Sequence, residues 1–311
     1  MKNLKDKDLE LFEYIAKLTQ PQLKNFLTKF LNAKYNKVVS NYDYIYAEGD
    51  IPICLVAHTD TVFQLPPEEI FYDSSKNVLW SPDGLGADDR AGIFAIIKII
   101  QSGLKPHIIF PADEEMGCVG SLKLAEKECP FKDLRYIIQL DRQGHSDCVF
   151  YDCHNENFID YVENFGFFIA TGSFSDISVL CPKWGVAGVN LSIGYKNEHS
   201  REEILYVAPM MVTIEKVKKM LTEQDIPYFE YVSKNKSSLF FTKCICDICG
   251  KEYPEDEIFE VYDLNNEIKN YCIHCVSEKN VTFCEKCYNA FEYEDESDVS
   301  MLCFKCAKGG C

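Results

Sequence analysis

Short, largely apolar runs recur along the first two-thirds of this chain, and an acidic residue or a histidine follows each of them closely. The run ICLVA ends at His58, HIIF is followed by Asp113, and YIIQL ends at Asp141. Short runs without polar residues are typical of strands that are covered on both faces. Segments with the helical spacing of apolar residues lie between them. The alternation predicts an α/β fold with a mixed central sheet and helices on both faces.

The expected elements follow the chain in a regular order. Strands are predicted within 38–50, 53–57, 107–110, 136–141, 148–152 and 185–203. Helices are predicted within 8–33 (two short ones), 91–103, 121–128, 155–165, the end of 171–180, and 206–224.

The stretch PDGLGADDRAG, residues 82–92, places two adjacent aspartates between glycine-rich chain and a run that looks like a buried helix. An aspartate at the start of a helix can cap its free N–H groups. Capping alone would therefore explain Asp88 and Asp89. Other stretches of the chain give Asp88 a second interpretation.

Histidine and acids at the other strand ends have the chemistry of a metal site. His58 and Asp60 are two apart on an extended chain and point the same way, so Asp60 can orient a metal-binding His58 ring. The other interpretation is a polar strand end. Of the adjacent glutamates Glu114 and Glu115, one can bind metal while the other, held off the metal, works as general base. Five ligand-type residues gather where open α/β sheets bind ligands: His58, Asp88, Glu115, Asp141 and His199.

The ordered set H-T-D, GLGADDRAG, D-E-E-x-G, L-D and NLSIGYKNEHS resembles the co-catalytic di-zinc metallopeptidases (clan MH). Peptidase T and the leucine-type and glutamyl aminopeptidases belong to this group. The match covers residues 5–225. It implies a zinc-dependent exopeptidase, most simply an aminopeptidase that removes N-terminal residues from small peptides.

The resemblance also implies a role for each residue. Asp88 would bridge two zinc ions, Glu114 would take a proton from a metal-bound water as general base, and Asp60 would support His58. The remaining ligands would be His58 and Asp141 on one ion, and Glu115 and His199 on the other. Imidazole and carboxylate ligands without thiolate suit catalytic zinc, and also cobalt or manganese.

Many relatives carry an inserted lid or dimerisation domain, and the spacing here leaves no room for one. About 30 residues separate His58 from Asp88, and about 58 separate Asp141 from His199. A domain without a lid resembles the aminopeptidases better, in which acids near the metals receive a free amino terminus. The candidates for that contact are Glu198, Asp176 and, least, Asp89, because capping explains Asp89.

Two other functions are compatible with the sequence. The same metal chemistry would serve an amidohydrolase or deacylase acting on non-peptide or N-acyl substrates, because the residues that shape the pocket are not visible in a sequence. A non-catalytic binding protein that works through its C-terminal region is the other alternative.

The net charge of −17 makes nucleic acid an unlikely partner, because such a surface repels phosphate backbones. No apolar run is long enough to span a bilayer, so no membrane partner is expected. The start of the chain, MKNLKDKDLE, lacks the apolar stretch of a signal peptide. We expect a cytoplasmic protein.

Ten of the 16 cysteines fall between Cys244 and Cys311, and eight of these form C-x-x-C pairs. In a cytoplasmic chain, paired cysteines favour metal over disulfides. We expect a catalytic domain over 1–225, a connector over 226–243 and a zinc-stabilised domain over 244–311. The apolar content of the last is thin, so zinc would supply much of its folding free energy.

Two structural zinc sites are predicted for this region. Sequential pairing, as in tandem zinc ribbons, gives one zinc Cys246, Cys249, Cys272 and Cys275, and the other Cys284, Cys287, Cys303 and Cys306. A cross-braced pairing is the alternative, and Cys244, Cys311 and His274 are interpreted as non-ligands. Because the region is acidic, we expect it to bind a protein partner or to self-associate.

Overall fold

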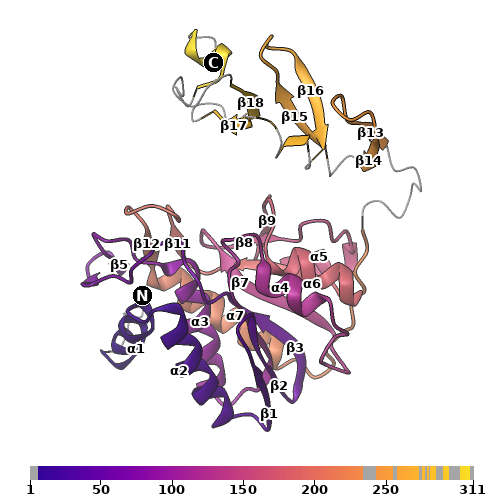
Figure 1. Ribbon diagram of the computed structural model, residues 1–311. Coiled ribbons are helices and arrows are strands. Elements are labelled where there is room, and N and C mark those ends of the chain that lie inside the picture. The colour runs from indigo at the N-terminus through magenta and orange to yellow at the C-terminus, as the bar shows by residue number, and fades with distance from the viewer. Residues whose placement is uncertain are drawn as a thin grey trace. The chain divides into compact units, whose positions relative to one another are not determined.

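The computed structural model describes residues 6–233, 243–254, 258–272, 275–276, 279, 281–284, 290–293 and 302–308. It divides into two compact units, Met1–Lys234 and Asn235–Cys311. Figure 1 shows the helices and strands of each unit.

The first unit is built on a mixed eight-stranded sheet in the order β1-β2-β6-β3-β7-β10-β8-β9. Its four central strands, β6, β3, β7 and β10, run parallel. Strand β2 pairs antiparallel with β1 and β6, and β8 pairs antiparallel with β10 and parallel with β9. The predicted mixed sheet is confirmed. The strands span Lys37–Ser40 (β1), Tyr44–Glu48 (β2), Ile51–Val56 (β3), Pro106–Pro111 (β6), Tyr136–Arg142 (β7), Asp147–Val149 (β8), Phe168–Ile169 (β9) and Gly188–Ser192 (β10).

Helices cover both faces of this sheet, as predicted. Helices α1, α3 and α7 pack together over β7 and β10, whereas α4 and α6 pack together over the opposite face; α2 lies against β1 and β2. The helices span Asp6–Ala16 (α1), Gln20–Asn32 (α2), Ala87–Gln101 (α3), Val119–Ala125 (α4), Glu156–Glu163 (α5), Asp176–Trp184 (α6) and Val207–Leu221 (α7).

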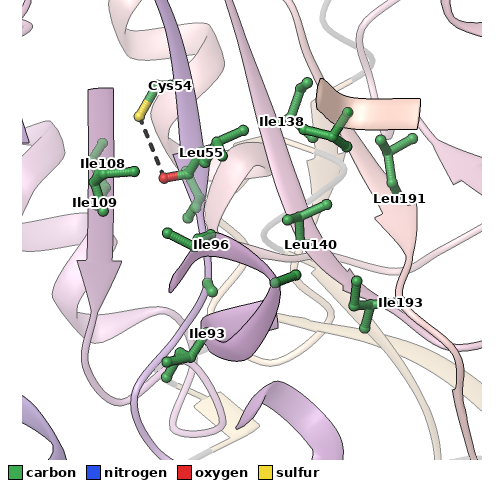
Figure 2. Packing of buried hydrophobic residues seen from close by; sticks show 14 of the residues in the cluster. Cys54, Leu55, Ile93, Ile96, Ile108, Ile109, Ile138, Leu140, Leu191 and Ile193 are labelled. Carbon is green, nitrogen blue, oxygen red and sulfur yellow. Dashed lines mark hydrogen bonds between the residues drawn. The ribbon is translucent and has the colours of Figure 1, made fainter. Parts of the chain in front are cut away.

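Apolar and polar residues alternate along strand β7 because its two faces have different neighbours. Successive side chains of a strand point to opposite faces of the sheet. Ile138 and Leu140 are fully buried in the core with Ile96 of α3, as Figure 2 shows. Gln139 and Asp141 point to the other face, where they meet the start of α6. The strand thus carries both the core and the polar site.

A small antiparallel sheet adjoins the central one, with the order β11-β12-β5-β4. Its strands are only two or three residues long, and the sequence did not predict β4, β5 or β12. The segment between His58 and Asp88 forms no separate domain within the described residues. The strands span Phe71–Asp73 (β4), Val78–Trp80 (β5), Tyr195–Lys196 (β11) and Ile204–Tyr206 (β12).

The first unit extends past the boundary that we expected at residue 225. Phe229 is buried in its core, its amide donates to the Arg135 carbonyl, and its carbonyl accepts from Ala187. Residues Val186 and Glu230 also form a β-bridge. The start of the expected connector, 226–233, is therefore part of the folded unit. Single hydrogen bonds and isolated β-bridges hold this segment, so its sequence carries neither a helical nor a strand period.

The second unit contains short strands and little apolar core. A hairpin, Lys243–Ile245 (β13) with Glu252–Pro254 (β14), precedes a four-stranded sheet in the order β16-β15-β18-β17. Most of its buried residues are cysteines. The remaining elements are Ile258–Tyr262 (β15), Ile268–Cys272 (β16), Val281–Phe283 (β17), Ala290–Glu292 (β18) and Phe304–Ala307 (α9). Among the helices in the described parts of both units, none combines the length and hydrophobicity needed to cross a membrane.

Candidate metal centre

The five ligand-type residues that the sequence singled out come together at the carboxyl ends of the central strands. Their ligand atoms form two groups in which all atoms lie within 4.8 Å of one another. His58, Asp88 and Asp141 make the first group, and Asp88, Glu115 and His199 make the second. Asp88 belongs to both groups, so its carboxylate joins them.

The two oxygens of Asp88 face different histidines. His58 Nε2 lies 2.9 Å from Asp88 Oδ1 and 3.6 Å from Asp141 Oδ1. His199 Nε2 lies 3.2 Å from Asp88 Oδ2 and 3.0 Å from Glu115 Oε2. Each group therefore offers one imidazole and two carboxylates, which are ligands that zinc, cobalt and manganese accept.

The electrostatics of the two groups fit ligand sets for divalent cations. The pKa of His199 rises to about 11, because Asp88 and Glu115 accept hydrogen bonds from its ring. Burial opposes ionisation of Asp88, but hydrogen bonds from His199 and His58 hold the pKa of this carboxyl below its usual value. Burial lowers the pKa of His58, but the neighbouring Asp141, Asp60 and Asp88 outweigh it and raise the pKa. The same carboxylates would stabilise a divalent cation in place of the proton, with the histidine nitrogen offering its lone pair.

Two further observations agree with this fit. Burial, together with the charge of Asp88, raises the pKa of Asp141 to about 7, so this carboxyl lacks enough positive charge around it. Glu115 Oε1 is buried and accepts no hydrogen bond. A buried oxygen without a partner is costly, by about 1–3 kcal/mol. Divalent cations in the two groups would satisfy both carboxylates.

The start of α3 separates the roles of the two adjacent aspartates. Asp89 is fully buried, and its oxygens accept from the Gly92 amide at 2.9 Å and the His58 amide at 3.2 Å. Asp89 therefore caps the helix and ties it to the end of β3. The backbone of Asp88 is not helical, and its side chain points into the metal centre. Capping explains Asp89 but not Asp88.

Asp60 links the two groups through the backbone. Its oxygens accept from the Glu114 and Glu115 amides at 3.1 Å each, and Oδ1 lies 3.3 Å from His58 Nδ1. Burial raises the pKa of Asp60, but the nearby His58 ring and the hydrogen bonds from the two amides outweigh it and lower the pKa. The carboxylate is placed to orient the His58 ring and the glutamate pair together.

Glu114 lines a cavity of about 350 Å³ beside the ligand residues. It is 8% exposed. Burial raises its pKa to about 9, and the negative charge of Asp141 adds to this effect. Bound cations would reverse the shift, because they favour the ionised carboxylate. Glu114 and Glu198 are the carboxylates of this wall that neither ligand group includes, and Glu114 directly precedes the ligand-type residue Glu115.

The structure adds a carboxylate that the sequence did not single out. Glu203 is fully buried, and its two oxygens accept from the Ala87 and Asp88 amides at 3.0 Å each. These two hydrogen bonds fix the backbone of Asp88, whose carboxylate belongs to both ligand groups. Glu203 stands in a polar loop four residues after His199 and 115 residues from Asp88, so no strand pattern or motif marked it.

The two expected substrate contacts have different surroundings. Asp176 is fully buried and accepts from Ser121 Oγ at 2.7 Å and Gln139 Nε2 at 3.1 Å. Its carboxylate holds α6 and β7 together and does not line the cavity, which differs from the contact that we expected. Glu198 lines the cavity, where it accepts from Gln143 Nε2.

The second unit brings paired cysteines together. The sulfur atoms of Cys246, Cys249, Cys272 and Cys275 form one group, and those of Cys284, Cys303 and Cys306 form another, each within 4.8 Å. The Cys272 amide donates to Cys246 Sγ at 3.4 Å. This grouping is the sequential one, not the cross-braced one. Cys287, His274 and Cys311 lie outside the described residues, as does the side chain of Cys244.

Comparison with solved structures finds this fold in peptidases at low sequence identity. Aminopeptidase PepT from Bacillus cereus matches over 70% of this chain and 97% of its own, with a TM-score of 0.56 and 14% identity. A tripeptidase from Staphylococcus aureus matches over 70% of this chain and 97% of its own, with a TM-score of 0.57 and 12% identity.

An aminopeptidase from the archaeon Desulfurococcus kamchatkensis matches over 71% of this chain and 96% of its own, with a TM-score of 0.55 and 14% identity. No protein-family model and no curated protein sequence matches this chain. These likenesses establish the fold that was predicted.

Proposed function

We propose that this protein is a metal-dependent aminopeptidase that removes N-terminal residues from small peptides. The observation that carries the proposal is the shared carboxylate of Asp88, with a histidine on each of its oxygens. Glu114 lies outside both ligand groups and lines the same cavity. A structural metal site needs no such free carboxylate, whereas a hydrolytic site needs a base.

The residues assigned to the first cation are His58, Asp88 and Asp141, and those assigned to the second are Asp88, Glu115 and His199. Two divalent cations held there, zinc and by ligand chemistry also cobalt or manganese, would supply a Lewis acid for the substrate carbonyl and lower the pKa of the attacking water. Three carboxylates opposing two dications leave a site of low net charge.

Glu114 is the general base in this proposal. It accepts the proton of the water that attacks the carbonyl carbon of the peptide bond, and it then donates that proton to the leaving amine nitrogen. Asp60 acts as a positioning residue, because its oxygens hold the amides of Glu114 and Glu115. Asp60 Oδ1, which accepts from the Glu114 amide, also lies 3.3 Å from His58 Nδ1, so Asp60 orients the His58 ring as well.

Glu198 is the acid that we assign to the free amino terminus of the substrate. It lies on the cavity wall and its carboxylate has one described partner, Gln143. A carboxylate with remaining acceptor capacity can bind an ammonium group. The three solved structures compared above are two aminopeptidases and a tripeptidase, which agrees with a substrate that has a free amino terminus.

We further propose that the second unit holds two structural zinc ions on the two cysteine groups. Four thiolates within one group are what a closed tetrahedral zinc site requires. Cys287 would complete the second group. The unit would then serve as a protein-interaction or self-association module.

Hydrolysis tests the proposal directly. The purified protein would be given aminoacyl amides, dipeptides, tripeptides and N-acyl amino acids with added zinc, manganese or cobalt. We expect N-terminal residues to be released, and Glu114→Gln to reduce kcat by at least about a hundredfold while the metals stay bound. Cleavage of N-acyl substrates alone would make the protein a deacylase. Full activity of Glu114→Gln would refute the assignment of the base.

A further inference from the structure

Arg142 lies on the wall of the cavity that Glu114 lines, and its side chain has no partner among the residues that the structure describes. The other charged residues of this wall are acidic, apart from His199, and include Asp141, Glu114 and Glu198. Arg142 is half-buried, and its Nε atom is buried without a hydrogen-bond acceptor. Its side chain makes no ion pair or hydrogen bond with any residue that the structure describes.

The missing partner is informative because acceptors are plentiful nearby. A guanidinium that served to neutralise the acidic wall would pair with one of these carboxylates. A buried donor without an acceptor is costly, so native structures rarely leave one. The acceptor that is missing among the described residues is therefore one that a ligand can bring.

The backbone holds Arg142 firmly at this place. It is the last residue of β7, directly after Asp141, and its carbonyl accepts from the Ile193 amide at 2.8 Å. The next residue, Gln143, donates to Glu198. One strand end therefore lines the cavity with a metal-site carboxylate, a free guanidinium and the partner of Glu198.

We propose that Arg142 binds a carboxylate group of the substrate, so that the site selects small peptides carrying both a free amino terminus and a carboxylate. The planar fork of a guanidinium matches a carboxylate with two parallel hydrogen bonds. Glu198 receives the amine and Arg142 receives the carboxylate. This inference rests on the proposed function for the reaction, but the binding contact itself does not require turnover.

The carboxylate has two sources, the C-terminus of a short peptide or an acidic side chain, and substrate pairs separate them. The first pair is alanylalanine and its C-terminal amide. The second pair is alanylglutamate amide and alanylglutamine amide. In the wild-type protein we expect kcat/KM to favour the carboxylate member of at least one pair by about 10- to 100-fold.

Arg142→Gln should reduce that preference by about the same factor, and Arg142→Lys should retain part of it. Arg135→Gln is the matched control, because it removes the same charge from an exposed arginine just before the other end of β7. The control should keep the wild-type preference. Equal kcat/KM within both pairs in the wild type, or an unchanged preference in Arg142→Gln, would overturn the proposal.

A binding arm separates this inference from the proposed reaction. The four peptides would be titrated calorimetrically into zinc-loaded Glu114→Gln, with and without Arg142→Gln. If no peptide is cleaved by the wild type but carboxylate peptides bind tighter through Arg142, the proposed function fails and the subsite stands. If peptides are cleaved without any preference, the subsite fails and the function stands. If no peptide is either cleaved or bound, both fail.

Discussion

Replacing Glu203 tests how the backbone beneath the shared carboxylate is held. The Glu203 carboxylate accepts hydrogen bonds from the Ala87 and Asp88 amides, at 3.0 Å each, and no solvent reaches it. Glutamine has the same shape but only one acceptor oxygen. In Glu203→Gln one amide keeps its partner, and the other faces an NH₂ group that cannot accept.

The expected loss follows from these two bonds. A hydrogen bond to a charged group contributes about 1.5–3 kcal/mol, and a buried donor without an acceptor costs about 1–3 kcal/mol. We therefore expect Glu203→Gln to lower the free energy of unfolding by about 2–4 kcal/mol. Because the freed backbone carries Asp88, metal affinity should also fall, by about tenfold or more.

The assay combines urea unfolding with metal titration at pH 8. Burial raises the pKa of Glu203 to about 7, so the wild-type carboxyl is ionised at this pH. Glu202→Gln is the control, because it removes the same charge from the exposed neighbouring side chain. If Glu203→Gln and Glu202→Gln have the same stability and the same metal affinity, the two hydrogen bonds do not hold the site and the reasoning is refuted.

Two further predictions concern other parts of the chain. His107 stacks on Phe131 and accepts from the Gly49 amide, and burial lowers its pKa to about 4. The unfolded chain therefore binds the proton first, so stability is complete above about pH 6.5 and falls by about 3 kcal/mol as the pH approaches 4. Urea unfolding across this range should show that extra loss in the wild type and not in His107→Gln; parallel pH profiles would contradict it. In the second unit, Cys272→Ser should lower the zinc content by about one ion per chain, measured by elemental analysis, because one cysteine group loses a ligand. Cys129→Ser, outside both groups, should keep it, and equal zinc in the two variants would contradict the assignment.

The central sheet and the gathering of the five ligand-type residues were predictable because both depend on short-range signals. An apolar run such as that before His58 identifies a buried strand, and a polar residue at its end marks the edge where ligands bind. The carboxyl ends of parallel strands meet at one edge of the sheet. Residues His58, Glu115 and Asp141 were therefore expected to lie together without knowledge of the strand order.

Contacts that depend on long-range packing were not predictable. Glu203 acts through a hydrogen bond to an amide 115 residues away, and glutamate in a polar loop is ordinarily solvated. Asp176 was expected in the cavity, but the first turn of α6 turns it inward to Ser121 and Gln139. Strand β12 has three residues, too few for a period of two to be recognised.

The most direct test of the account is a cobalt titration of the full chain, freed of metal, in the wild type and in Asp88→Ala. Cobalt bound by thiolates in the second unit absorbs through sulfur charge transfer, whereas cobalt bound by nitrogen and oxygen shows only weak visible bands. We expect two nitrogen- and oxygen-bound equivalents in the wild type and the loss of both in Asp88→Ala, with the thiolate signal unchanged, because one carboxylate belongs to both ligand groups. Two equivalents of unchanged affinity in Asp88→Ala would contradict the shared carboxylate.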